Sequence, residues 1–272
     1  MSDEKYCYPD SDVLINKYGI KELEELYKKE RRVTAVTITN ISLNPVKGNF
    51  DLKHLQAIHK AIFSDIYDWA GKLRTVDIAK SNMFCRVQFM QDYSQDIFDR
   101  LKNDKYLIGM DKAQAIEKLA EYIGDINALH PFREGNGRTQ RQYIFYLAKT
   151  TGIYLDFSKA NPDKMMKASL DSFQMKYSGF KELFNDIATP IPIQEQENFL
   201  KKISKVAYKE FQQLQQHNRI PDRVEEFKRI DKKDYQLENS GSIDKAQWEN
   251  LLDQNPLPAH DISAPQIDMD RK

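Results

Sequence analysis

Twelve consecutive residues, 130–141, carry most of the chain's candidate chemistry. They read His-Pro-Phe-Arg-Glu-Gly-Asn-Gly-Arg-Thr-Gln-Arg and supply one imidazole, one carboxylate, two glycines and three guanidinium groups. A segment destined for burial would avoid so much charge, because an unpaired charge that loses its hydration costs several kcal/mol. The combination of glycines with arginines instead indicates the binding of an anion.

The flanking segments must position these residues, and their patterns predict two packed helices. In residues 111–129 apolar side chains recur at spacings of three and four, which gives one face of a helix. Residues 143–148 are apolar on nearly every side, so the second helix should be central and buried, ending near Gly152. The candidate chemistry therefore lies in the turn between two helices.

Gly135, Asn136 and Gly137 come directly before the second predicted helix. The first amides of a helix have no carbonyl partner within it, and the helix dipole favours negative charge at that end. Glycine also tolerates positive φ and lets a ligand approach the backbone closely. The turn is therefore predicted to bind phosphate.

The twelve residues resemble the signature of the Fic family, His-x-Phe-x-(Asp/Glu)-Gly-Asn-Gly-Arg-x-x-Arg, and every specified position is filled. Fic enzymes transfer the AMP moiety of ATP to a protein hydroxyl. The resemblance therefore implies a protein adenylyltransferase, which is a nucleotidyltransferase that uses ATP and Mg²⁺. It also implies a mainly α fold, a Fic-type helical bundle with a small β-hairpin flap over the active site.

The resemblance implies a role for each position of the signature. His130 is the catalytic base that takes the proton from the target hydroxyl, and Glu134 holds the Mg²⁺ that bridges the α- and β-phosphates. Asn136 and the glycine amides bind phosphates, while Arg138 and Arg141 hold the β- and γ-phosphates. Phe132 anchors the loop in the core. The residues assigned to nucleotide binding are Phe132, Gly135, Asn136, Gly137, Arg138 and Arg141.

General chemistry asks for the same residue types. Nucleotidyl transfer needs positioning and charge neutralisation more than covalent help, and amides, arginines and a metal supply both. One carboxylate suffices for Mg²⁺, because this ion keeps several waters and takes further oxygens from substrate phosphates. A histidine suits the role of base, because its ordinary pKa of about 6.5 leaves it mostly neutral near pH 7.

Composition narrows the class of protein and of partner. The 272 residues include 41 Lys+Arg and 41 Asp+Glu, so the formal net charge is zero and neither nucleic acid nor a membrane surface is expected as the main partner. Cys7 and Cys85 are expected to be free thiols. No signal peptide is visible at the acidic N-terminus, so the expected location is the cytoplasm, with secretion into a host cell left open.

A β-hairpin is predicted between the helical segments at residues 76–86. Val76 and Ile78 alternate with polar residues before the turn, and Met83, Cys85 and Val87 alternate after it. By the Fic resemblance this hairpin is the flap, whose open edge aligns the target segment by strand addition. An excursion without function is the alternative. The predicted flap comprises Val76, Asp77, Ile78, Ala79, Lys80, Ser81, Asn82, Met83, Phe84, Cys85 and Arg86.

The remaining pattern predicts a Fic domain over residues 1–190. Residues 13–20 are similar to the entry of Fic domains in bacterial toxins and effectors. Helices are predicted at residues 21–32, 51–68 and 91–103, and the first of them should turn Leu23 and Leu26 inward. His54 and His59 lie on the helix at 51–68 and are interpreted as partly exposed surface or packing residues. Residues 154–157 are predicted to be a connector, after which Asn161 and Pro162 should open a further helix. Another helix is predicted at 178–188, and it must end there because residues 189–192 cannot continue a helix.

Residues 191–254 are predicted to form a helical extension. A clean apolar stripe runs along residues 194–216, which indicates one helix that must bury a face against the Fic domain, a partner protein or a second subunit. Shorter helices are predicted at 221–230 and 243–252. Residues 255–272 are polar and proline-containing and are predicted to be a disordered tail.

A regulatory motif of the family is incomplete in this chain. Many Fic enzymes carry a helix with Ser/Thr-x-x-x-Glu-Gly/Asn, whose glutamate pairs with the second signature arginine, here Arg141. Glu197, Glu238 and Glu249 each precede an asparagine, but the residues four positions earlier are Ile193, Asp234 and Lys245. The inhibitory glutamate is therefore expected from a separate small antitoxin.

From the sequence we predict a protein adenylyltransferase that acts on a Tyr, Ser or Thr hydroxyl of a target protein. We expect it to be a bacterial toxin or effector. Similarity to toxin-type relatives makes type II topoisomerase subunits candidate targets. Two alternatives stay open. One is a phosphotransferase of the same fold, although Gly137 argues against it, because such relatives carry lysine at that position. The other is a non-catalytic scaffold that binds a partner through its C-terminal helices.

Overall fold

The computed structural model describes residues 5–79 and 83–238, with side chains described to residue 230. Within these ranges the fold is mainly α, as predicted, with ten α-helices and one two-stranded antiparallel sheet. The helices are α1 (Leu23–Leu43), α2 (Leu52–Phe63), α3 (Met90–Asn103), α4 (Lys112–Leu129), α5 (Asn136–Thr150), α6 (Pro162–Ser172), α7 (Ser178–Ile187), α8 (Ile193–Ile203), α9 (Lys205–Gln216) and α10 (Arg223–Glu238). The strands are β1 (Ile153–Leu155) and β2 (Ala188–Pro190).

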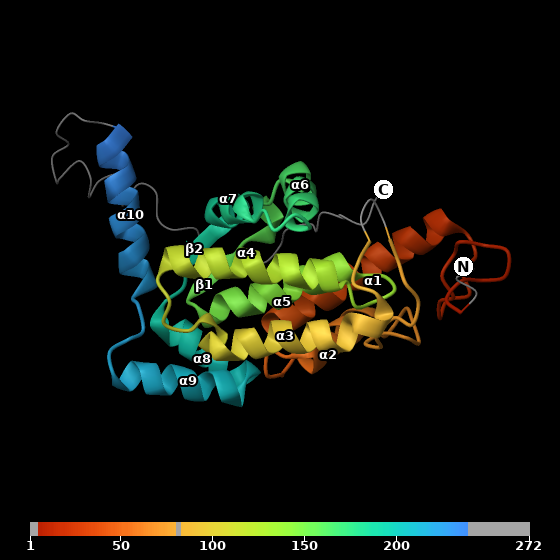
Figure 1. Ribbon diagram of the computed structural model, residues 1–272, viewed down its shortest axis with the longest axis horizontal. Coiled ribbons are helices and arrows are strands. Elements are labelled where there is room, and N and C mark those ends of the chain that lie inside the picture. Colours follow the sequence, from red (N-terminus) through yellow and green to blue (C-terminus); the bar gives the residue numbers. More distant parts are fainter. Residues whose placement is uncertain (1–4, 80–82, 239–272) are drawn as a thin grey trace.

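Helix α5 is the centre of the bundle. Its residues from Tyr143 to Ala148 are buried on every side, as the continuous apolar run predicts. Helices α2, α4 and α8 pack against it, and α4 and α5 run side by side across the molecule, with α6 and α7 on one side and α9 on the other (Figure 1). The start of α5 is thereby anchored in the core of the bundle.

Helix α4 is fixed at both ends. Asp111 caps its first turn by accepting a hydrogen bond from the Gln114 amide at 2.8 Å, while the Gln114 side chain accepts one from the Asp111 amide at 3.2 Å. Such a capping box satisfies two amides that would otherwise lack partners. The helix ends at His130. Its exit point, and with it the start of residues 130–141, is therefore well defined.

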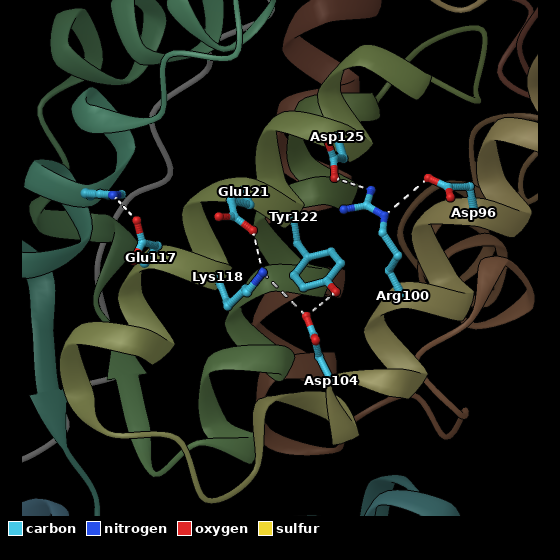
Figure 2. Close-up of polar contacts among 9 residues, drawn as sticks. Asp96, Arg100, Asp104, Glu117, Lys118, Glu121, Tyr122 and Asp125 are labelled. Carbon is cyan, nitrogen blue, oxygen red and sulfur yellow. Dashed lines mark hydrogen bonds and ion pairs between the residues drawn. The ribbon is translucent and has the colours of Figure 1, made fainter.

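Charged side chains join α4 to its neighbours (Figure 2). Arg100 of α3 contacts Asp125 of α4 at 2.6 Å, and the Tyr122 hydroxyl donates to Asp104 at 2.8 Å. A single exposed pair of this kind contributes at most about 1 kcal/mol, but several such contacts together help to hold helices in register. The contacts form three groups: Asp96, Arg100 and Asp125; Asp104, Lys118, Glu121 and Tyr122; and Glu117 with Lys181, which belongs to α7.

The first helix is longer than predicted. Residues 21–32 were expected, whereas α1 continues to Leu43 through a segment rich in threonine and valine. The hydroxyls of Thr37 and Thr39 bond back to carbonyls one turn earlier, which accommodates β-branched residues, and Thr34 and Ile38 are buried. Leu23 is exposed rather than inward, because it opens the helix beyond the packed part.

The strands do not lie where the sequence placed them. Residues 154–157 were expected to be a connector and 189–192 were expected only to end a helix, but Tyr154 pairs with Thr189 in the short sheet of β1 and β2. Three residues per strand are too few to show an alternating pattern. In the predicted flap, the described residues form only an isolated antiparallel bridge between Ala79 and Met83, and Lys80, Ser81 and Asn82 lie outside the described residues. In the described part of the segment, one bridge is thus found in place of the expected ladder, and residues Val87–Phe89 form a 3-10 turn.

The predicted single helix at 194–216 is two helices. Ser204 has extended backbone angles and caps α9 by accepting a hydrogen bond from the Ala207 amide at 3.3 Å. The apolar stripe packs into the same core as the rest of the bundle, with Phe199, Leu200 and Phe211 buried. This face is therefore covered by the chain itself and is not left open for a partner.

Further toward the C-terminus, the helix predicted at 221–230 begins at Arg223 and continues to Glu238 as α10. The helix predicted at 243–252 and the tail at 255–272 lie outside the described residues. The domain boundary at residue 190 stays a prediction. In the part of the chain that the structure covers, no helix combines the length and apolar character needed to cross a membrane.

Candidate active site

His130 terminates α4 in the left-handed conformation, with φ 44° and ψ 60°. Its amide bonds to the Ile126 carbonyl at 3.0 Å, and Nδ1 lies 3.3 Å from the Asn127 carbonyl. A carbonyl only accepts, so this contact places the proton on Nδ1 and the ring lone pair on Nε2. The ring of Phe84 stacks on the imidazole at a centroid distance of 3.6 Å. The imidazole is therefore held in one orientation.

Arg74 holds the backbone of the same residue. Its Nε donates to the His130 carbonyl at 2.8 Å, and its amide donates to the Pro131 carbonyl at 2.9 Å. The remaining guanidinium nitrogens reach the carbonyls of Val76 and Cys85. Burial lowers the pKa of Arg74, but an arginine stays protonated. The sequence patterns did not point to Arg74, because it lies far from the signature in sequence.

The turn after His130 is fixed by side chains from inside the protein. The Asn136 side-chain amide accepts from the Phe132 amide at 2.9 Å and donates to the Phe132 carbonyl at 2.8 Å. Phe132 is buried, as predicted for the anchor of the loop. In this structure the Asn136 side chain thus braces the loop, and its predicted contact with a phosphate stays a prediction.

His59 of α2 supports the loop from the opposite side. Its ring stacks on Phe132 at 3.9 Å, its Nδ1 accepts from the Gly71 amide at 2.8 Å, and its Nε2 donates to the Glu134 carbonyl at 3.0 Å. Burial lowers the pKa of His59 to about 3, so the ring is neutral at neutral pH. It was interpreted as partly exposed surface or packing, whereas it is fully buried. Its spacing of four residues from Leu55 and from Phe63, both buried, is the signal that places it on the inner face.

Gly135 and Glu134 form the tightest part of the turn. Gly135 has φ +78°, and a Cβ there would overlap the ring of Phe63, so only glycine fits. One carboxylate oxygen of Glu134 accepts from the Gly135 amide at 2.8 Å, and the side chain is partly exposed. A partly exposed, hard oxygen ligand beside helix amides suits Mg²⁺ that is bound chiefly by phosphates and water. Among the described residues there is no group of three or more His, Cys, Asp and Glu that could hold a metal alone.

The signature arginines have different surroundings. Arg138 is buried and pairs with Glu30 of α1 at 2.6 Å, above the ring of Phe63, and the Tyr67 hydroxyl donates to the same glutamate. Arg141 is only half-buried and shares a helix face with Gly137, four residues earlier. The half-buried Arg133 lies 4.0 Å from the Cys7 sulfur. Arg141 and Gly137 are therefore the better placed of the signature residues in α5 to meet a ligand from solvent.

The structure brings part of the predicted flap to this site. Phe84 covers the imidazole, and the Cys85 amide bonds to the Ala128 carbonyl at 2.9 Å. Asp77 accepts from the Val87 amide at 2.8 Å, and Met83 is exposed. The arrangement combines an oriented imidazole, a carboxylate, guanidinium groups and the amino end of a buried helix, which suits transfer chemistry on a phosphorylated ligand.

Comparison with known proteins gives the family. The model of the Fic/DOC family matches residues 49–148. The Escherichia coli protein named "Probable protein adenylyltransferase Fic" is 31% identical over 188 residues, covering 68% of this chain and 92% of that protein. The chain belongs to the Fic/DOC family. Protein adenylyltransferase VbhT of Bartonella schoenbuchensis is 36% identical over 173 residues, which are 63% of this chain but only 36% of VbhT.

Solved Fic domains share the fold. The N-terminal Fic domain of a VirB-translocated Bep effector from Bartonella quintana, solved with bound ADP, superposes with a TM-score of 0.66 and 30% identity, covering 69% of this chain and 96% of that one. The BepC protein of Bartonella tribocorum, solved with bound AMPPNP, gives a TM-score of 0.66 at 26% identity over 69% of this chain and 97% of that one. Adenine nucleotides therefore bind to structural neighbours of this chain.

Proposed function

We propose that this chain transfers the AMP moiety of ATP to a Tyr, Ser or Thr hydroxyl of a target protein. The observation that carries the proposal is the orientation of His130, whose Nδ1 lies 3.3 Å from the Asn127 carbonyl and whose ring comes directly before the turn that opens α5. Membership of the Fic/DOC family supports it, because two relatives that match this chain over 92% and 90% of their own length are named "Probable protein adenylyltransferase Fic".

The chemistry assigns one task to each group. Nε2 of His130 takes the proton of the target hydroxyl while that oxygen forms a bond to the α-phosphorus. The bond between the α-phosphorus and the oxygen that bridges to the β-phosphate breaks, and pyrophosphate leaves. The first amides of α5 and the guanidinium of Arg141 hold the terminal phosphates. Arg138, fixed by Glu30, adds positive charge from inside the protein, and its direct contact with the β-phosphate stays a prediction.

Glu134 is the residue that would hold Mg²⁺. When bound, the ion would offset negative charge on the α- and β-phosphates. The carboxylate of Glu134 is already oriented by a hydrogen bond from the Gly135 amide, and the backbone carbonyl of Glu134 accepts a hydrogen bond from His59. The chain thus contributes a single preset ligand and leaves the others to phosphate oxygens and water.

The test uses ATP labelled at the α- or the γ-phosphate, with a bacterial lysate as the source of targets. We expect label from the α-phosphate only. His130→Ala should lower incorporation by about 100-fold or more with ATP affinity nearly unchanged, because it removes the base but no phosphate ligand. His217→Ala, at an exposed histidine after α9, is the matched control. Label from the γ-phosphate would favour phosphotransfer, and absence of any label would favour the scaffold.

The proposed partners follow from the same site. A small antitoxin would supply the glutamate that pairs with Arg141, and type II topoisomerase subunits in the cytoplasm are the first targets to assay. A peptide carrying Ser/Thr-x-x-x-Glu-Gly/Asn should suppress AMP transfer by the chain, and Arg141→Ala should weaken that suppression. Undiminished suppression of the Arg141→Ala variant would contradict the pairing.

A further inference from the structure

Arg74 joins three separate segments through one buried guanidinium that is 2% exposed. Nε donates to the His130 carbonyl at 2.8 Å, Nη1 donates to the Val76 carbonyl at 2.8 Å, and Nη2 donates to the Cys85 carbonyl. These acceptors are the backbone of the candidate base and the two limbs of residues 76–86. The carboxylate of Asp77 also lies 3.7 Å from Nη1, so the hydration that the buried cation loses is offset by three carbonyls and one carboxylate.

Each of the three acceptors lies where backbone position matters. His130 has a left-handed conformation, which costs a residue other than glycine about 1–2 kcal/mol and persists only when neighbours hold it. Val76 and Cys85 flank the single bridge between Ala79 and Met83, which is too little pairing to fix the two limbs by itself. Among the described residues of this segment, the guanidinium therefore joins the two limbs more firmly than that one bridge does.

The phosphate-binding half of the loop is held by other residues. Asn136 braces Phe132, and His59 bonds to the Glu134 carbonyl, while neither contacts the guanidinium of Arg74. His130 and the described residues 76–79 and 83–86 form one group, and the amides and carboxylate that are proposed to bind the phosphates form another. Loss of the first group should thus leave nucleotide binding largely intact.

We propose that Arg74 is a positioning residue that fixes the described residues 76–79 and 83–86 relative to His130, and so sets where an acceptor hydroxyl bound beside these residues meets the imidazole. The inference rests on the proposed AMP transfer and goes beyond it, because it assigns the alignment of base and acceptor to a residue outside the signature. Arginine is required because its planar fork directs donors to three carbonyls at once. Lysine keeps the charge but concentrates its donors on one nitrogen.

The decisive variant is Arg74→Lys, with Arg219→Lys at an exposed position as the matched control. We measure incorporation of α-labelled AMP into lysate proteins at saturating ATP, ATP affinity by calorimetry, and folding by circular dichroism. Arg74→Lys should lower the rate about 10- to 100-fold, because misplacement of about 1 Å has effects of that size. ATP affinity should stay within about twofold, and Arg219→Lys should match the parent protein in every measurement.

Each outcome separates this inference from the proposed function. If the parent protein incorporates no label, the proposed function fails. If the parent is active and Arg74→Lys incorporates AMP at the same rate, the positioning role is wrong. It is also wrong if Arg74→Lys loses ATP affinity by the same factor as the rate of AMP incorporation. Should Arg74→Lys not fold, Asp77→Asn decides, since Asp77 is exposed, lies 3.7 Å from Nη1 and keeps its hydrogen bond from the Val87 amide as asparagine. A rate unchanged by Asp77→Asn, where a loss of about threefold is expected, would then overturn the inference.

Discussion

At the scale of single residues, the loop is shaped by two left-handed positions, His130 and Gly135. The first is held by Arg74 and Phe84 and orients an imidazole, while the second has no side chain and lies against Phe63. The two positions differ because residue 130 must present a side chain, whereas a side chain at residue 135 would overlap the Phe63 ring. Together they turn the chain from the end of α4 into the start of α5.

Gly135→Ala should destabilise the protein and abolish AMP transfer. The added Cβ would overlap the Phe63 ring in addition to the cost of positive φ, so we expect a loss of about 2–4 kcal/mol in the free energy of unfolding. Gly19 offers a matched control, because it has φ +67° and no atom lies within 4 Å of the place a methyl group would take. Gly19→Ala should cost about 1 kcal/mol and keep activity. Equal losses in urea unfolding would contradict the role of Phe63.

The signature could be predicted at this scale, but its supports could not. His130, Glu134 and the glycines are recognisable because their types and spacing are local. Arg74, His59 and Glu30 act through carbonyls and ion pairs with residues distant in sequence, as the separation of Arg74 from His130 by 56 residues illustrates. No periodicity encodes such a contact, so these residues look like ordinary members of a helix or loop.

At the scale of elements, α8 and α9 belong to the body that carries the site. Helix α8 packs on α5, and the Gln196 side chain donates to the Thr150 carbonyl at the end of α5 at 2.7 Å. The sequence predicted the apolar stripe but not the break at Ser204, since a serine inside an apolar pattern reads equally as an exposed helical residue. Likewise β1 and β2 were missed because their register depends on pairing between residues far apart in the chain, such as Tyr154 and Thr189.

Phe211→Ala tests this packing. The side chain is fully buried, so its loss should cost about 3–5 kcal/mol in the free energy of unfolding, in a single transition shared with the rest of the bundle. Val206→Ala on the same helix is the control, because Val206 is 40% exposed and its loss should cost less than about 1 kcal/mol. A separate, early transition confined to the Phe211→Ala variant would show that α9 is an independent appendage.

At the scale of the whole molecule, folding keeps two neutral histidines inside the bundle. Burial lowers the pKa of both His54 and His59, the latter from 6.5 to about 3. The unfolded chain takes up these protons below pH 6.5, whereas the folded chain takes up that of His59 only near pH 3. Stability from this group is therefore fully present above pH 6.5 and is lost as the pH falls toward 3.

His59→Gln should flatten the dependence of stability on pH. In the parent protein, His59 alone contributes a fall of up to about 1.4 kcal/mol per pH unit between about pH 6 and pH 4. The glutamine variant should be less stable at about pH 7 but should lose less stability on acidification, since His54 and the carboxylates contribute equally to both. Urea unfolding at several pH values measures the difference, and parallel curves for the two proteins would contradict a buried neutral His59.

The anchoring of α10 has a practical consequence for shortened versions of the protein. Nε of Arg223 donates to the Thr151 carbonyl at 2.7 Å, and another guanidinium nitrogen donates to the Met110 carbonyl. This arginine from the start of α10 therefore binds the backbone at the carboxyl end of α5 and just before the amino end of α4, and we call this pair of contacts the seal. A truncation that ends before residue 223 would uncover these carbonyls and weaken both helices that frame the loop. A reporter fused at the C-terminal side of α10 preserves that seal, whereas one inserted between α9 and α10 separates it from the helices it protects.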